Sequence, residues 1–154
     1  MRWSNPQERP EVGILRDQTL RLDRKFSVRD LAYTAGLLDG EGCITGTSNG
    51  TQHSLMIFIS SSDMLILDWL QEKYGEGSRV WNSNPKGRRV EKWLIPAKSI
   101  TPFLKLMIPF LKIKRAQLYK ALAIRTMIES KKSDARIARA IGQLHAMNQT
   151  GRVR

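Results

Sequence analysis

Residues 27–47 constrain the fold of this chain more than any other segment. Ser27, followed three residues later by Asp30, is the pattern of a helix N-cap with a capping box. Apolar residues then recur at helical spacing and predict one buried stripe, made of Val28, Leu31, Ala35 and Leu38. We expect the helix to break at residues 39–42, where two glycines flank an acidic residue. The short β-branched run that follows, residues 43–47, predicts a strand.

A second face of this predicted helix carries almost no side chains. Ala32, Gly36 and Gly40 lie four residues apart and therefore fall on one side of the helix. Glycine inside a helix costs about 1 kcal/mol relative to alanine. That cost is understandable if another backbone packs very closely against this face. The other backbone belongs either to a second copy or to another element of the same chain.

Charge and length bound the class of protein. The chain has 154 residues, which favours one domain with a core of its own. It carries 26 lysines and arginines against 14 acids, a formal net charge of +12, with a pI near 10.4. A pI above about 9 is typical of a nucleic-acid binder. The alternatives are a merely soluble basic protein and one attracted to an anionic membrane.

Several other classes are disfavoured. A single cysteine, Cys43, excludes an intrachain disulfide and a cysteine-based zinc site. His53 and His145 are far apart and lack metal-ligand spacing. No apolar run approaches the roughly 18 residues of a membrane span. The N-terminal residues include no hydrophobic signal region, and they carry four acids, unlike an organellar transit peptide. We therefore expect an intracellular protein without a membrane partner.

The rest of the chain predicts an α+β fold with the element order αββαββ followed by helices. After the first strand we expect strands at residues 52–60, 77–82 and 88–95, with the first turn at Asn49-Gly50. Further helices are expected after Ser61, at 98–107, at 112–128 and after Ser133. Residues 1–26 form an N-terminal extension, 27–129 the core, and 130–154 a basic C-terminal helix and tail.

Residues 34–42, Thr-Ala-Gly-Leu-Leu-Asp-Gly-Glu-Gly, resemble the signature of the LAGLIDADG homing endonucleases, with Thr34 in place of the usual leucine. The element order resembles the αββαββα core of that family with its antiparallel β-saddle. The segment Pro-Phe-Leu-Lys-Ile-Lys at 109–114 is similar to one in the single-motif, group I intron-encoded members. In that family two motif helices pack together, and this chain has one motif, so the resemblance implies a homodimer. The implied interface residues are Ala32, Ala35, Gly36, Asp39 and Gly40.

The resemblance also implies a metal site at the end of the motif helix. Two acids brought together repel strongly, and a divalent cation offsets this repulsion. Carboxylate and carbonyl oxygens suit Mg²⁺, so Glu41 would bind the ion through its side chain and Gly40 through its carbonyl, with Asp39 supporting the helix end. Lys114 matches a basic residue that assists at the scissile phosphate. Ser61 stands where the family often has a glutamine that positions water; its alternative role is a helix cap.

The four strands would form a saddle on double-stranded DNA, because a β-ribbon fits the major groove. Phosphate contacts position such a protein, whereas base contacts specify the sequence. A register error of one residue would exchange the two faces of a strand. The candidates for base contacts are Thr45, Thr47, Gln52, Ser54, Asn82, Arg89 and Glu91. The candidates for phosphate contacts are Lys86, Arg88 and Lys112.

The prediction is a homodimeric, Mg²⁺-dependent homing endonuclease that cuts both strands of a long pseudo-palindromic site. Its expected location is the cytoplasm or nucleoid, or the organelle whose genome carries the gene. Two alternatives stay open on the same fold. One is a maturase that binds intron RNA and assists splicing, and the other is a DNA-binding protein that has lost cleavage.

Overall fold

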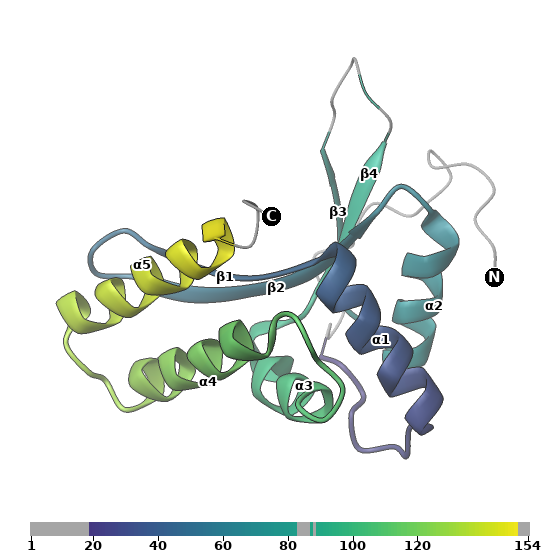
Figure 1. Ribbon diagram of the computed structural model, residues 1–154, viewed down its shortest axis with the longest axis horizontal. Helices are drawn as coiled ribbons and strands as arrows, with labels where there is room; N and C mark the ends of the chain where they lie inside the picture. Colours follow the sequence, from purple (N-terminus) through teal and green to yellow (C-terminus); the bar gives the residue numbers. More distant parts are fainter. Residues whose placement is uncertain (1–18, 83–86, 88, 151–154) are drawn as a thin grey trace.

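A four-stranded antiparallel sheet with its helices on one face forms the body of the protein (Figure 1). The computed structural model describes residues 19–82, 87 and 89–150. The strands are β1 (Gly42–Ser48), β2 (His53–Ser61), β3 (Ser78–Asn82) and β4 (Val90–Leu94), in the spatial order β1-β2-β4-β3. The helices are α1 (Val28–Glu41), α2 (Met64–Tyr74), α3 (Ile100–Met107), α4 (Arg115–Glu129) and α5 (Asp134–Thr150), with a 3₁₀ turn at Ala97–Ser99. The predicted α+β class and element order are confirmed.

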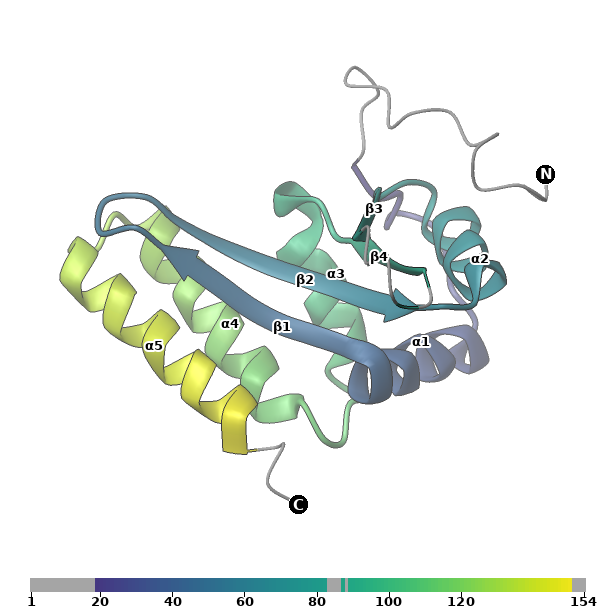
Figure 2. The same ribbon diagram turned by 90° about the horizontal axis from the view of Figure 1, so that it is seen from above.

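The sheet has one covered face and one open face. Seen from above, β1 and β2 lie in front of α3 and α4, and no helix of the described residues crosses over them (Figure 2). The β3–β4 hairpin rises steeply from the end of this ribbon (Figure 1). Only residues 58–61 of β2 pair with β4, which leaves most of β1–β2 as a long two-stranded arm.

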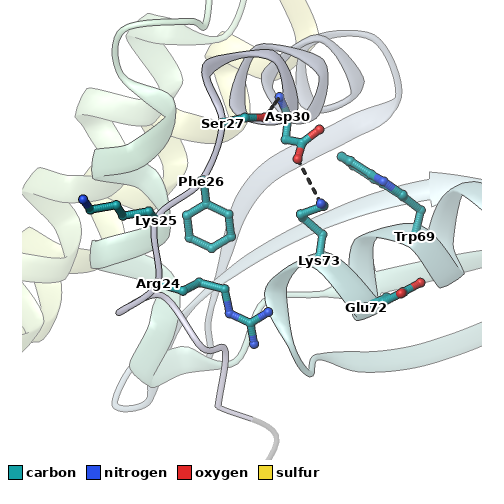
Figure 3. A pocket seen from close by; sticks show the side chains of 8 residues that line it. All are labelled: Arg24, Lys25, Phe26, Ser27, Asp30, Trp69, Glu72 and Lys73. Carbon is teal, nitrogen blue, oxygen red and sulfur yellow. Dashed lines mark hydrogen bonds and ion pairs between the residues drawn. The ribbon is translucent and has the colours of Figure 1, made fainter.

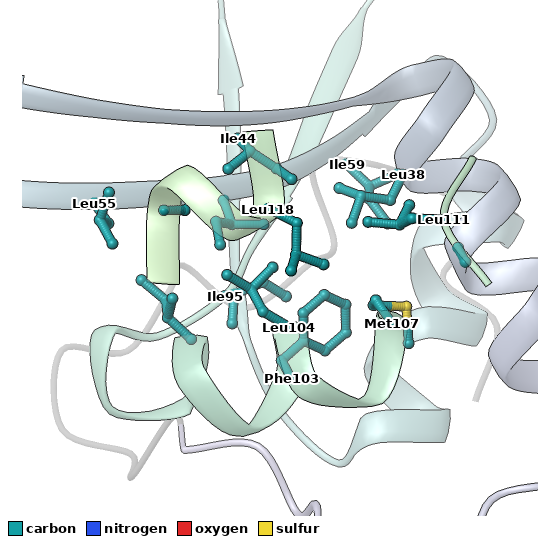
Figure 4. Packing of buried hydrophobic residues seen from close by; sticks show 14 of the residues in the cluster. Leu38, Ile44, Leu55, Ile59, Ile95, Phe103, Leu104, Met107, Leu111 and Leu118 are labelled. Atoms are coloured by element: carbon teal, nitrogen blue, oxygen red, sulfur yellow. The ribbon is translucent and has the colours of Figure 1, made fainter. Parts of the chain in front are cut away.

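Alternation along the strands builds the core on the covered face. Ile44 pairs with Ile57, and both are fully buried, as is the neighbouring Ile59. These side chains meet apolar residues of the helices, among them Leu38, Phe103, Leu104, Met107 and Leu118 (Figure 4). Alternate residues of β2 therefore face the core.

Helix α5 belongs to the same core. Three of its apolar residues at helical spacing, Ile137, Ile141 and Leu144, are buried. On the edge strand β1, the carbonyl of Gly46 lies 2.7 Å from Nε2 of His145, and the carbonyl of Ile44 accepts a hydrogen bond from Nδ2 of Asn148 at 2.9 Å. Edge strands present unpaired backbone groups that invite aggregation, so α5 also protects this edge.

The short segment before α1 packs against the core rather than extending away from it. Leu20 is buried, and its N–H donates to Oγ of Ser99 at 3.0 Å. The N–H of Arg21 donates to the carbonyl of Tyr74, whose ring also stacks at 5.0 Å on Phe26. Residues 1–18 of the predicted extension lie outside the described residues. Among the described residues, no helix is both long and apolar enough to cross a lipid bilayer.

Helix α1 begins and ends where the sequence predicted. Oγ of Ser27 accepts the N–H of Asp30 at 3.1 Å, which confirms the N-cap. The helix continues through Glu41, so the expected break within residues 39–42 is confirmed. It ends at Gly42, whose N–H donates to the carbonyl of Leu38. A Cβ at Gly42 would lie 2.5 Å from Cδ1 of Leu38, so only glycine fits this turn from helix to strand.

A buried hydroxyl replaces the usual leucine of the motif. Thr34 is fully buried; it accepts a hydrogen bond from the hydroxyl of Tyr74 at 2.6 Å and donates to the carbonyl of Asp30 at 2.8 Å. The polar group is therefore satisfied on both sides. Burial raises the pKa of Tyr74 to about 12. The prediction that Val28 is buried is wrong; this first-turn residue is 70% exposed.

Candidate functional site

The last turn of α1 lies where the helix runs into β1, at the inner end of the β1–β2 arm (Figure 1). Glu41 and Gly40 are both exposed there. Carbonyls in the last turn of a helix have no intrahelical partner. The carbonyl of Leu38 accepts from Gly42, and that of Asp39 accepts from the ammonium of Lys114. The carbonyl of Gly40 comes next in this turn, beside an exposed carboxylate.

Asp39 has a different role from its neighbours. Its Oδ2 accepts the N–H of Lys112 and its Oδ1 accepts the N–H of Lys114, both at 2.9 Å. These residues belong to the segment between α3 and α4. We expected Asp39 to support the end of its own helix. Its carboxylate instead holds a segment that is distant in sequence. Because its carboxylate is engaged inside the chain, its assignment to a dimer interface is not supported.

Lys114 lies at the same end of α1 as Glu41. Burial lowers the pKa of the Lys114 amine, and the nearby carboxylates of Asp39 and Glu41 oppose part of this effect. The side chain is half-buried, so its charge is only partly screened by water. A basic group thus stands beside the exposed carboxylate of Glu41. Lys112 is also exposed in this region.

Ser61 has a local structural partner. It is the last residue of β2, and its Oγ accepts the N–H of Asp63 at 2.9 Å. Asp63 in turn caps α2 by accepting the N–H of Leu65. Ser61 also pairs with Glu91 on β4, which places it on the covered side of the sheet. The turn at the start of α2 accounts for this serine, and its role in positioning water stays a prediction.

The donor set at the end of α1 fits a shared cation better than one held by a single copy. Glu41 and Gly40 offer hard oxygen atoms of the kind that Mg²⁺ prefers. Both oxygens of Asp39 are engaged by backbone N–H groups. Within the described part of the chain, no group of three or more His, Cys, Asp or Glu residues could hold a metal. The remaining ligands would have to come from a second copy, from phosphate or from water.

The small-residue face of α1 is open. Ala32, Gly36 and Gly40 are exposed, and a Cβ added at either glycine would meet no atom within 4 Å. Among residues 19–82, 87 and 89–150, therefore, no other element packs against the two glycines. The assignment of Ala35 to this interface is wrong, because Ala35 is completely buried in the protein's own core.

The open face of the first hairpin carries the predicted polar residues. Thr45 and Thr47 alternate with the buried Ile44 and Gly46. Ser54 pairs with Thr47, and their hydroxyl oxygens are 2.8 Å apart. Gln52 is exposed in the turn just before β2, rather than in the strand itself. These four residues form a polar surface along the β1–β2 arm.

On the β4 side of the second hairpin, the two faces were predicted the wrong way round. Glu91 is 2% exposed and lies on the covered face, where its Oε2 accepts from Arg79 at 2.6 and 3.0 Å. Arg89 pairs with the same carboxylate at 3.2 Å and stacks 4.1 Å from the ring of Trp81. Glu91 and Arg89 are thus wrong as open-face residues. Lys92 occupies that face, opposite Ser60 on β2.

Of the other candidates on the second hairpin, Asn82 alone lies within the described residues. Asn82 is the last residue of β3 and pairs with Val90. Lys86 and Arg88 lie outside the described residues. Lys92 was not among the residues predicted for the open face, although the sequence identifies it. Glu91, Trp93 and Ile95 alternate, and the two apolar members mark the covered face for all three.

A hollow of about 460 Å³ lies at the opposite end of α1 (Figure 3). It is lined by Arg24, Lys25, Phe26, Ser27, Asp30, Trp69, Glu72 and Lys73. Nζ of Lys73 lies 2.9 Å from Oδ2 of Asp30 across it. Because α1 has 14 residues, it is about 20 Å long, and this hollow is separate from the Glu41 end.

No protein-family model and no curated protein matches the chain. Solved structures do. The homing endonuclease I-CvuI, in complex with DNA and in the presence of magnesium, has a TM-score of 0.64 and 19% identity over 77% of this chain and 82% of that chain. The archaeal intron-encoded homing endonuclease I-Vdi141I, complexed with DNA, has a TM-score of 0.66 and 12% identity over 77% of this chain and 84% of that chain.

A longer protein matches as well. The LAGLIDADG homing endonuclease I-GzeII, in complex with its DNA target, has a TM-score of 0.59 and 18% identity. The match covers 79% of this chain but 44% of I-GzeII. At these identities the likeness concerns the arrangement of helices and strands. The αββαββα order, the motif helix ending at Glu41 and these matches together establish that the chain has the fold of the LAGLIDADG homing endonucleases.

Proposed function

We propose that this protein is a homodimeric, divalent-metal-dependent homing endonuclease that cuts both strands of a long pseudo-palindromic DNA site. One observation carries the proposal. The exposed carboxylate of Glu41 stands where the open face of the sheet meets the open small-residue face of α1. A surface for DNA, a surface for a second copy and an acid suited to metal binding therefore meet at one point.

The small-residue face supports the homodimer. Helices approach most closely where their side chains are small. On this face Gly36 and Gly40 have no side chain, and Ala32 has only a methyl group. Two α1 helices packed through this face would bring their two Glu41 ends toward each other. The match to 44% of I-GzeII supports the same arrangement, because two copies of this chain would then correspond to one longer protein.

The residues at this end of α1 have distinct expected roles. Glu41 and Gly40 would hold the ion, which we expect to be Mg²⁺. When bound, Mg²⁺ activates water and offsets negative charge on phosphate. The ammonium of Lys114 adds positive charge where the phosphate would lie. Because Lys114 is half-buried, this charge acts more strongly than that of a fully solvated lysine.

The open face of the sheet supports DNA recognition. Thr45, Thr47 and Ser54 can both donate and accept hydrogen bonds, so they can contact base edges in the major groove. We expect Lys92 on this face, and Lys112 near Glu41, to contact phosphates. Affinity that depends on phosphate contacts falls steeply with salt, because each contact releases counterions. We therefore expect target binding to weaken strongly as the salt concentration rises.

A cleavage assay tests the proposal. The substrate is DNA spanning the gene's insertion site with the intervening sequence removed, incubated with and without Mg²⁺. We expect a double-strand cut only with the metal. A specific gel shift without any cut would instead support a DNA-binding protein that has lost cleavage. Absence of both cutting and binding would contradict the proposal and direct attention to the intron RNA.

One observation favours RNA binding as a second candidate function. Residues 97–150, which contain α3, α4 and α5, hold two acids, Glu129 and Asp134, and both are paired, with Arg125 and His53 respectively. Among the described residues, by contrast, Lys92 is the one cation on the open face of the sheet. The cations of this helical layer are Lys98, Lys105, Lys112, Lys114, Arg115, Lys120, Arg125, Lys131, Lys132, Arg136 and Arg139.

Such an excess of positive charge suits a phosphate backbone. If intron RNA binds this layer, a gel shift with that RNA should persist when unlabelled target DNA is added. Displacement of the RNA by the DNA would place both on the sheet and remove support for a separate RNA surface.

A further inference from the structure

One residue links the end of α1 to the segment that carries Lys114. The carboxylate of Asp39 accepts the backbone N–H groups of Lys112 and Lys114, each at 2.9 Å. Its backbone carbonyl accepts the ammonium group of the same Lys114. Both the main chain and the tip of the lysine are therefore held by a single residue of another element.

The segment has little regular structure of its own to fix it. α3 ends at Met107, α4 begins at Arg115, and the residues between them are a turn and a short irregular stretch. Leu111 is fully buried and anchors the middle of this stretch, whereas Ile113 is 65% exposed. The bonds to Asp39 thus fix the part of the segment that apolar packing does not.

Asp39 and Glu41 do different things because they point in different directions. Residues two apart in an α-helix are rotated by about 200°. Asp39 faces the α3–α4 connection, and Glu41 is exposed at the junction with the sheet. Loss of the Asp39 carboxylate would free the backbone N–H groups of Lys112 and Lys114, and Lys114 would then be tied to α1 only through its ammonium group and the carbonyl of residue 39. The turn that carries Glu41 would stay in place. Small displacements of a positioned group can cost large factors in rate.

We propose that Asp39 is a positioning residue that fixes Lys114 beside Glu41 and acts on cleavage through Lys114 alone. As far as cleavage is concerned, the proposal rests on the proposed endonuclease function. The hydrogen bonds themselves do not, so the first test measures them without any substrate.

The first test is residue-resolved amide hydrogen exchange by NMR on the full chain. In Asp39→Ala we expect the amides of Lys112 and Lys114 to exchange at least about tenfold faster, since exchange follows local opening. Amides of α5 should be unchanged. Asp39→Asn keeps the size and one acceptor oxygen, so it should show a smaller acceleration. Unchanged exchange at both lysines in Asp39→Ala would overturn the proposal.

The second test is a double-mutant cycle in single-turnover cleavage of target DNA. Asp39→Ala should cut about 10- to 100-fold more slowly, the range for residues that support a functional group, with unchanged target affinity. If Asp39 acts through Lys114, the double variant Asp39→Ala/Lys114→Ala should cut no more slowly than Lys114→Ala. Multiplying effects would overturn the proposal, because Asp39 would then act by another route.

A matched control separates positioning from stability. Asp30→Ala removes an acid from the same helix, where Asp30 pairs with Lys73 far from Glu41. It should leave the cleavage rate unchanged. If the wild-type chain cuts no DNA, the endonuclease proposal fails, and the exchange experiment still decides whether Asp39 holds the segment.

Discussion

The two ends of α1 use similar residues for different purposes. At the start, Asp30 sits in the first turn and pairs with Lys73 at 2.9 Å beside an open hollow (Figure 3). At the end, Asp39 bonds two backbone N–H groups of a distant segment, and Glu41 is exposed. Only the first arrangement follows the rules for a stable helix, because an acid near a helix N-terminus is favourable.

The far end breaks those rules. Asp39 and Glu41 lie at the C-terminal end of α1, where the helix dipole disfavours negative charge, and the last turn has no basic residue. Lys114 and the two N–H groups come from elsewhere in the chain and compensate Asp39. Sites where local rules fail and distant groups compensate are often functional. We therefore assign a stabilising role to the start of α1 and a chemical role to its C-terminal end, with the small-residue face between them.

Glu41→Gln is the strongest test of this assignment. The amide keeps the shape of the side chain but removes the charge that a cation needs. We expect cleavage to fall by more than about 100-fold, the upper range for losing a supporting group, with target binding retained. Glu72→Gln, at an exposed site in the hollow at the other end, is the matched control and should cut normally. Joint loss of binding and folding in Glu41→Gln would mean that Glu41 is structural.

Gly36→Leu tests the face between the two ends. A Cβ at Gly36 meets no atom of the described residues within 4 Å, so we expect the monomer to fold. In a symmetric helix pair the leucine would clash from both copies, and about 1–3 kcal/mol for each predicts dimerisation weakened by roughly 30-fold or more. Sedimentation velocity measures this.

The same substitution elsewhere provides the control. Gly142, on α5, has equally open space around it, and Gly142→Leu should leave the oligomeric state unchanged. If Gly36→Leu dimerises as well as the wild type, α1 is not the interface.

The sequence predicted the parts of this helix that depend on local rules. The N-cap at Ser27 and the spacing of Ala32, Gly36 and Gly40 need only helical periodicity. The end of the helix within residues 39–42 also follows from local rules, because Gly-Glu-Gly is a typical helix stop. The bonds from Asp39 to Lys112 and Lys114 could not be predicted, because they depend on how α3 and α4 return to α1.

The two hairpins show the same limit. In the first, a long clean alternation around Ile57 and Ile59 fixed the register and hence the polar face. In the second, charged residues occupy both faces, since the buried Glu91 pairs with Arg79. Polarity then gives no guide to the face, and only the apolar Trp93 and Ile95 do. The two faces of a strand can be predicted where the buried residues are the hydrophobic ones. They cannot be predicted from polarity where a buried ion pair takes the place of apolar residues.

Thr34→Val tests how α1 is held to the core between its two ends. The valine leaves the hydroxyl of Tyr74 without its partner, so we expect about 1–3 kcal/mol less stability in urea unfolding. The double variant Thr34→Val/Tyr74→Phe removes both hydroxyls and should recover most of the loss. Cleavage at saturating target should be unaffected at temperatures where the variant stays folded. A rate loss in the folded variant would mean that this part of α1 also serves the chemistry.

Asp30→Asn should have the smallest effect, and it tests whether the start of α1 only stabilises. The hydrogen bond from Lys73 holds the pKa of Asp30 below its ordinary value of 3.8. A carboxyl with a depressed folded-state pKa stabilises the protein above its unfolded pKa, and this contribution is lost as pH falls through the folded one. The variant should therefore melt slightly lower at neutral pH, by less than about 2 °C because the pair is exposed.

The difference in melting temperature between Asp30→Asn and the wild type should disappear in acid below pH 3.8 and shrink in high salt. Thermal melts from pH 7 to pH 2 measure it, alongside cleavage at pH 7. A variant that melts normally but cuts slowly would contradict the purely stabilising role of the start of α1, because both ends of the helix would then contribute to the chemistry.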